Sequence, residues 1–168
     1  MTILRAIVLL LLGSCCAVLG FGKTEKIRYR CTLIENVSHA LGLLRTAICY
    51  RADRLCDAAG QLKDCQPSAF WSAFAQTLSR GGSAGQAWEE AERSGELALL
   101  SPECRKGLRR FSQALGKTSR PEQEREFELA AQTLSRELEQ TRRELQSKGK
   151  LNSALGVLGG VILVILFI

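Results

Sequence analysis

Charge is missing from both ends of this 168-residue chain. Arg5 is the one charged residue before residue 23, and none follows residue 150, so residues 23–150 carry 22 basic and 17 acidic side chains. About 20 apolar residues in a helix reach ~30 Å, the thickness of the hydrocarbon core of a bilayer. We therefore expect transmembrane helices at 1–22 and 151–168, and a charged domain at 23–150. This excludes a plain soluble globule and a multidomain enzyme.

Proline is scarce as well, and strand-like alternation of apolar residues is absent. The three prolines lie outside the periodic stretches. Apolar residues recur every three or four positions in two segments, from near Ile27 to about Tyr50 and from about Pro121 to Lys148, which indicates two long helices. We predict an all-α fold, a bundle of about five or six helices. The two periodic stripes consist of Ile34, Val37, Leu41, Leu44 and Ile48, and of Phe127, Ala131, Leu134, Leu138, Thr141 and Leu145.

Shorter helices between these two begin at recognisable caps. Ser68 precedes one apolar run, Ser83 and Gln86 have the spacing of a capping box, and Ser101 is followed by a proline at the first helical position. Gly81-Gly82 and Gly116 are typical of helix ends. The large apolar residues of these segments form the predicted core, namely Phe70, Trp71, Phe74, Leu78, Trp88, Leu97, Leu108, Phe111 and Leu115.

Histidine occurs once, as His39, which leaves little material for a metal or catalytic site. The seven cysteines form no C-x-x-C pair, so we expect reduced cysteines packed as small apolar residues and no bound metal. The glycine-rich segment 81–85 is not followed by a lysine, as a phosphate-binding loop requires. We therefore predict no cofactor and no catalytic residue. A membrane enzyme that pairs His39 with a cysteine is a third alternative.

Basic residues crowd the inner flanks of both predicted spans. Segments 23–30 and 142–150 are rich in lysine and arginine, whereas the outer flanks hold only Arg5. By the positive-inside rule the middle domain is cytoplasmic and both termini face outward, so we expect a cell-membrane protein in contact with anionic lipid.

Small residues inside the two spans have the spacing that lets membrane helices approach closely. Gly13 and Ala17 are four positions apart in the first span, and Gly156 and Gly160 in the second, so we consider all four candidates for helix packing. A rival interpretation of the N-terminal segment is a lipoprotein signal peptide with a lipid on Cys15. The chain would then be an exported lipoprotein with a helical binding domain.

One charge feature is left unexplained by topology. Residues 105–120 contain six basic residues and no acid, and an acidic segment follows at 122–128. A solvated helix face or pairing between the two segments accounts for this pattern, and a docking surface for an acidic partner is the functional alternative. Nucleic acid is not expected, because Phe111 is the only aromatic residue in the stretch and no binding motif is present. The candidate partner-binding residues here are Arg105, Lys106, Arg109 and Arg110.

Four segments resemble the stage III sporulation protein AB family. Gly82–Trp88 is similar to its glycine-serine-alanine-glycine and tryptophan motif, Leu115–Gln123 to its Leu-Gly turn and helix start, and Ser153–Ile168 to its C-terminal anchor. Leu41–Tyr50 lies where the family has a leucine-rich helix, although Ala47 replaces the usual acid. Arg120-Pro121-Glu122 also departs from the family pattern.

The resemblance implies a role in the complex that connects mother cell and forespore. It implies a helical domain similar to the cytoplasmic domains of inner-membrane platform proteins of type II secretion and type IV pili. Such a platform would lie in the mother-cell membrane around the forespore, and would dock a secretion-type ATPase to other membrane components. Trp88 joins the basic stretch as a candidate contact, and a homo-oligomer is an open alternative.

Overall fold

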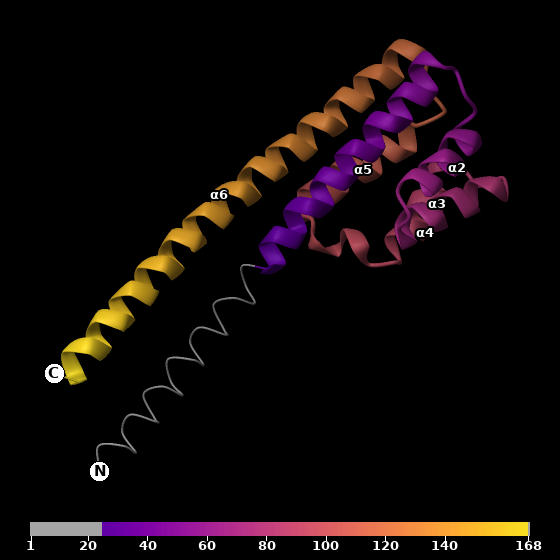
Figure 1. Ribbon diagram of the computed structural model, residues 1–168. Helices are drawn as coiled ribbons and strands as arrows, with labels where there is room; N and C mark the ends of the chain where they lie inside the picture. Colours follow the sequence, from indigo (N-terminus) through magenta and orange to yellow (C-terminus); the bar gives the residue numbers. More distant parts are fainter. Residues whose placement is uncertain (1–24, 168) are drawn as a thin grey trace. The chain divides into compact units, whose positions relative to one another are not determined.

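The computed structural model describes residues 25–167, with side chains through residue 147. All regular structure in this part of the chain is helical, which confirms the all-α prediction. Six α-helices are present, the first over residues 25–45 and continued by a π-helix, η1 (Figure 1). The other elements are η1 (Thr46–Tyr50), α2 (Leu55–Cys65), α3 (Ala69–Ser79), α4 (Ala84–Glu92), the 3-10 helix η2 (Glu96–Leu99), α5 (Pro102–Ala114) and α6 (Arg120–Phe167).

The chain divides into two compact units. One consists of Met1–Cys31 with Gln140–Ile168, and the other is Thr32–Glu139. In the described part of the first unit, Ile27, Cys31 and Thr141 are buried. The second unit contains α2 to α5 entire, and it lies within the domain predicted at 23–150. The candidate surface residues of the middle domain all belong to it.

Inside the second unit the first helix runs alongside the start of α6. The Arg45 guanidinium, near the end of the first helix, donates to Glu124 at 2.9 Å and to Glu128 at 3.4 Å. The hydrogen bond that Arg45 donates to Glu124 is the main reason that the pKa of Arg45 is raised. Because the C-terminal end of one helix meets the N-terminal part of the other, the two helices are antiparallel.

A cluster of aromatic rings holds α3 and α4 together. Trp88 of α4 lies edge-on to Phe70, Trp71 and Phe74 of α3, with ring centroids 4.9, 6.1 and 6.0 Å away. Every residue of the predicted core is buried. The aromatic cluster therefore forms the centre of the second unit, as the sequence predicts.

The helix starts also agree with the predicted caps. The Ser68 hydroxyl accepts from the Trp71 backbone N–H, and Ser83 and Gln86 form the complete capping box. Gly81 and Gly116, at the predicted helix ends, have φ angles of +85° and +78°, which glycine adopts without the strain of a Cβ. Local sequence signals thus placed α3, α4 and α5 correctly.

The apolar stripe of α6 differs from the predicted one. Phe127 and Leu134 are buried as expected, but Ala131 is exposed and the adjacent Ala130 is buried in its place. Glu137 is also buried, one position before the predicted Leu138, which is only partly buried. Thr141, farther along the predicted stripe, is buried as well, so Ala131 is the one predicted position that is exposed.

The predicted membrane spans are not described by this structure. Residues 1–22, including Gly13, Cys15 and Ala17, lie outside the described part. The segment with Gly156 and Gly160 belongs to α6, but its side chains lie beyond the described ones. None of the helices in the described residues has the length and apolar content needed to cross a membrane. The two spans stay predictions.

Candidate partner-binding surface

Helix α5 carries most of the basic residues that the sequence singles out. Its start is fixed by the Ser101 hydroxyl, which accepts from the Cys104 N–H at 3.1 Å, and by Pro102 in the first turn. Cys104, Leu108 and Phe111 recur every four or three residues and are buried. This packing turns the basic side of the amphipathic helix outward.

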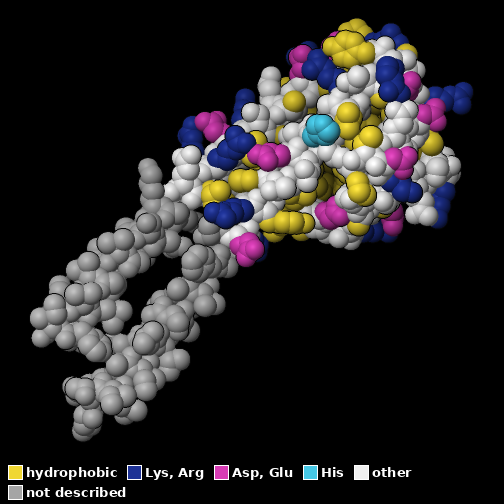
Figure 2. Space-filling view, in the orientation of Figure 1, with side chains coloured by type: hydrophobic (Ala, Val, Ile, Leu, Met, Phe, Trp, Pro, Cys, Tyr) yellow, Lys and Arg dark blue, Asp and Glu magenta, His cyan; other side chains and the backbone are white. Residues whose placement is uncertain are grey.

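Lys106, Arg109 and Arg110 are exposed on the outer side of this helix, and we call these three residues the α5 basic face. Neither Lys106 nor Arg110 has an ion-pair partner within 4 Å among the described residues. Figure 2 shows that elsewhere on the visible surface basic and acidic side chains are interspersed. Two unpaired cations one turn apart are therefore available to an acidic partner.

Arg109 differs from its two neighbours because it is already engaged. Its guanidinium donates to the Glu92 carboxylate of α4, and this hydrogen bond raises the pKa of Arg109. The acidic group comes from α4 and not from the segment 122–128, which the sequence suggested as a source of pairing. The pair ties α5 to α4 and leaves part of the α5 basic face neutralised.

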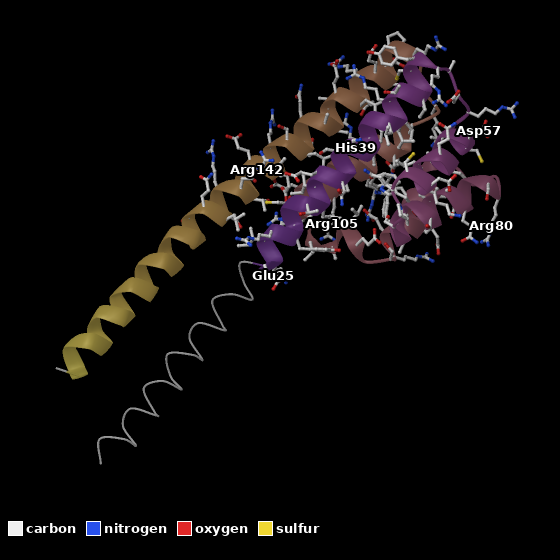
Figure 3. The ribbon with its side chains drawn as sticks, in the orientation of Figure 1. Glu25, His39, Asp57, Arg80, Arg105 and Arg142 are labelled. Atoms are coloured by element: carbon white, nitrogen blue, oxygen red, sulfur yellow. The ribbon has the colours of Figure 1, made fainter. Side chains whose placement is uncertain are left out.

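Arg105 is only partly exposed (Figure 3). Its Nε atom is buried and has no hydrogen-bond partner. Arg105 therefore offers a partner less of its charged group than the exposed Lys106 and Arg110 do. Arg105 thus borders the α5 basic face and does not belong to it.

Trp88 does not lie on the surface. Its exposed fraction is 0%, and three aromatic rings of α3 surround it. The suggestion that Trp88 contacts a partner is corrected by this burial, because no partner reaches the indole while α3 and α4 stay packed. The tryptophan of the family-like motif serves the core, where a large apolar ring gains most from leaving water.

A buried carboxylate positions the start of α5, and the sequence analysis did not anticipate it. Glu137 of α6 is 5% exposed and accepts from the Ser101 backbone N–H at 3.0 Å and from the Ser101 hydroxyl at 2.7 Å. Buried acids without partners are costly, whereas one that accepts two hydrogen bonds is tolerated. The Ser101 hydroxyl thus accepts a hydrogen bond from α5 and donates one to α6. We call the contact between Ser101 and Glu137 the Ser101–Glu137 latch.

The motif glycines have structural roles. A Cβ at Gly82 would lie 2.8 Å from Thr77 Cγ2 and 3.0 Å from the Thr77 carbonyl oxygen, closer than real contacts allow. At Gly85 a Cβ would meet Gln113 at an ordinary 3.5 Å. The first glycine of the motif is therefore required by the tight turn between α3 and α4, and the second is not.

His39 and the described cysteines are the residues on which a metal site or a cysteine–histidine pair would depend. His39 Nδ1 lies 2.7 Å from the Gln66 amide nitrogen, so its described partner is an amide (Figure 3). The five described cysteines form no disulfide with one another, and none of the described residues form a group of three or more potential metal ligands. Within this part of the chain the α5 basic face is the site that the sequence and the geometry both favour.

Comparisons with known proteins give the family. The model of the stage III sporulation protein AB family matches residues 5–168. A solved structure titled "Stage III sporulation protein AB" superimposes with a TM-score of 0.63 at 25% identity, covering 70% of this chain and 97% of the other. A search of curated protein sequences gave no match. The chain belongs to the stage III sporulation protein AB family and is a component of the sporulation machinery, for which no catalytic function is indicated.

Proposed function

We propose that this family member is a membrane-anchored platform of the mother cell–forespore channel, and that it docks a secretion-type ATPase through the α5 basic face. The observation that carries the proposal is the pair of exposed cations, Lys106 and Arg110, without ion-pair partners among the described residues. A surface of this kind attracts an acidic partner over distances of about a Debye length and orients it on approach.

The surroundings of α5 favour a fixed docking element. The Ser101–Glu137 latch holds its first turn, Arg109 ties its middle to α4, and the Phe111 ring packs on Phe127 of α6 at 4.9 Å. A partner that binds such a helix loses little free energy to ordering it. Force applied to α5 would also be passed directly to α6.

The membrane part of the proposal rests on the sequence. The two predicted spans and the basic flanks at 23–30 and 142–150 favour the mother-cell membrane around the forespore, with the middle domain in the cytoplasm. The same flanks would contact anionic lipid headgroups. The α5 basic face lies between these flanks in the sequence, so its charge is not needed for orientation.

The decisive experiment reverses the charge of the unpaired cations. We expect Lys106→Glu with Arg110→Glu to reduce co-purification of the full chain with the ATPase at least about tenfold, because an attraction becomes a repulsion. The matched control is Lys63→Glu with Arg80→Glu, which makes the same change of charge at exposed positions on α2 and after α3. Circular dichroism checks that both variants keep their helices.

Equal co-purification of the two charge-reversal variants would reject the α5 basic face as the docking surface. Failure of the unmodified chain to co-purify with the ATPase would reject the docking role itself. A selective loss with Lys106→Glu and Arg110→Glu that follows the salt dependence of a charged interface supports both.

A further inference from the structure

One exposed hydrophobic side chain belongs to the helix that packs against α5. The exposed large hydrophobic residues in the described part of the chain are Tyr29, Leu43, Tyr50 and Leu129, and Leu129 is the one on α6. Its exposed fraction is 45%. Single leucines of this kind are common on protein surfaces, so the importance of Leu129 depends on what surrounds it.

Helices α5 and α6 run antiparallel. Ser101 at the start of α5 contacts Glu137, and Phe111 farther along α5 contacts Phe127. Residue numbers therefore rise along one helix while they fall along the other. This pairing fixes which residues of the two helices lie opposite one another.

Leu129 lies at the level of Arg110 in this antiparallel pair. The two helices are close at Gly107, where an added Cβ would lie 3.3 Å from Thr133 Cγ2. Arg110 follows Gly107 by three residues and Leu129 precedes Thr133 by four, so each is one helical turn from this contact in the same direction along the pair. Because both side chains are exposed, they lie on the solvent side of the seam between α5 and α6.

Exposed cations surround Leu129 on both helices. Lys106 and Arg110 come from α5. On α6, Arg125 precedes Leu129 by four residues and Arg136 follows it by seven, positions that share one face of a helix. All four cations are exposed, and none has an ion-pair partner within 4 Å among the described residues. We call Leu129 and these four cations the Leu129 patch.

The acids near the patch leave most of this charge uncompensated. Glu103 lies in the first turn of α5, where a carboxylate offsets the helix dipole. Glu122 caps the start of α6, Glu126 is only partly exposed, and Glu128 is bonded to the first helix. The exposed charge around Leu129 is therefore mainly positive.

We propose that the partner docked by the α5 basic face covers the Leu129 patch with an acidic amphipathic helix. An apolar side chain of that helix packs on Leu129, and carboxylates on either side of it face the cations. This inference rests on the proposed function, and it names the element through which the partner binds. It also extends the docking surface from α5 to α6.

Charge and spacing select this occupant. Four cations without ion-pair partners attract an acidic surface and repel a basic one. At about 1.5 Å per residue, Arg125 lies ~6 Å before Leu129 along α6 and Arg136 lies ~10 Å after it, distances that one or two turns of a partner helix span. A central apolar contact inside a rim of charges is the arrangement in which a single side chain contributes most to binding.

The first test measures binding of the full chain, purified in mild detergent, to the ATPase by surface plasmon resonance. Leu129→Gln should raise the dissociation rate about tenfold, because glutamine keeps the helix propensity of leucine but loses its apolar contact. Leu129→Met keeps an apolar side chain of similar volume and should bind as the unmodified chain does. Leu43→Gln is the matched control, since it makes the same change at a leucine of similar exposure on the first helix.

The cations of α6 are tested by the same measurement. Arg125→Glu with Arg136→Glu should lower the association rate about tenfold and weaken its dependence on salt, because charges at the rim of an interface act mainly on the encounter. Leu129→Gln should leave the association rate and its salt dependence nearly unchanged.

Crosslinking identifies the partner segment. With p-benzoylphenylalanine in place of Leu129, ultraviolet light should crosslink the chain to a segment of the ATPase that has acids three or four positions from an apolar residue. Mass spectrometry of the product locates that segment. The same replacement at Leu43 should give no crosslink to the ATPase.

Weaker binding with Leu129→Gln, but not with Leu129→Met or Leu43→Gln, together with a crosslink to an acidic segment supports the inference. Full binding by Leu129→Gln, an equal loss with Leu43→Gln, or a crosslink that is absent or maps to a segment without acids would overturn it. If Lys106→Glu with Arg110→Glu still weakens binding in that case, the proposed function stands without the inference. An unmodified chain that does not bind the ATPase overturns both.

Discussion

The α3–α4 and α5–α6 pairs are held together in different ways. Rings join α3 to α4, with Trp88 edge-on to Phe70 at 4.9 Å and to Phe74 at 6.0 Å. Between α5 and α6 there is one ring pair, Phe111 with Phe127, together with the Ser101–Glu137 latch. The first pair gains stability from apolar burial, and the second uses a polar contact to position the helix with the basic face.

The largest expected loss of stability comes from a substitution in the α3–α4 pair. Trp88→Ala should lower the free energy of unfolding by about 3–5 kcal/mol, because it removes a fully buried ring and leaves a cavity. Urea unfolding of the full chain in detergent, followed by far-UV circular dichroism, measures the change. A loss below about 1 kcal/mol would mean that the rings are not the main contact between α3 and α4, and the comparison would fail.

The latch should contribute less than the rings but show coupling between its partners. Glu137→Ala should cost about 1–3 kcal/mol of unfolding free energy, since it leaves the Ser101 N–H and hydroxyl without their acceptor. Ser101→Ala should cost about 1 kcal/mol through the lost cap. The double variant should lose less than the sum of the two, as contacting residues do. Strict additivity in a double-mutant cycle would show that the latch is not a direct interaction.

The two motif glycines in the α3–α4 region should differ in the sign of their effect on stability. Gly82→Ala should destabilise the protein by about 1–3 kcal/mol, because its Cβ would lie 2.8 Å from Thr77 Cγ2 and the Thr77 carbonyl oxygen at 3.0 Å leaves little room to adjust. Gly85 lies inside α4, where an added Cβ would make an ordinary contact with Gln113 at 3.5 Å. Gly85→Ala should therefore be neutral or stabilise the protein by up to about 1 kcal/mol. Thermal unfolding of both variants gives the sign, and the same sign for both would contradict the geometry.

The α3–α4 pair could be predicted from the sequence almost entirely. Ser68, Ser83 and Gln86 are local signals, and a run such as 69–75 has no stable position outside a core. Helix α2 was not assigned, because Arg54 at its start makes no side-chain cap. The 3-10 helix η2 was missed for a similar reason, since its N-cap Gly95 also makes no side-chain cap.

The α5–α6 pair could be predicted from the sequence only in part. The start of α5 and the position of its basic residues follow from Ser101, Pro102 and the apolar spacing. The burial of Glu137 does not, because it depends on a serine 36 positions away in the sequence. The pairing of Arg109 with Glu92 is equally a tertiary contact between two helices. Spacing along one helix carries no information about either contact. The sequence predicts Trp88 both as a core residue and as a candidate contact, and its burial decides for the core.

The cysteines of α2 and α5 give the molecule a built-in measure of local opening. Cys104 lies in the first turn of α5 with its thiol buried, whereas Cys56 and Cys65 on α2 are exposed. A thiol reagent therefore reaches the α2 positions at once and Cys104 only when α5 separates from its neighbours. When α5 closes faster than the reagent reacts, the rate of labelling at Cys104 reports the population of the open state in the unmodified chain, in isolation or in a membrane assembly.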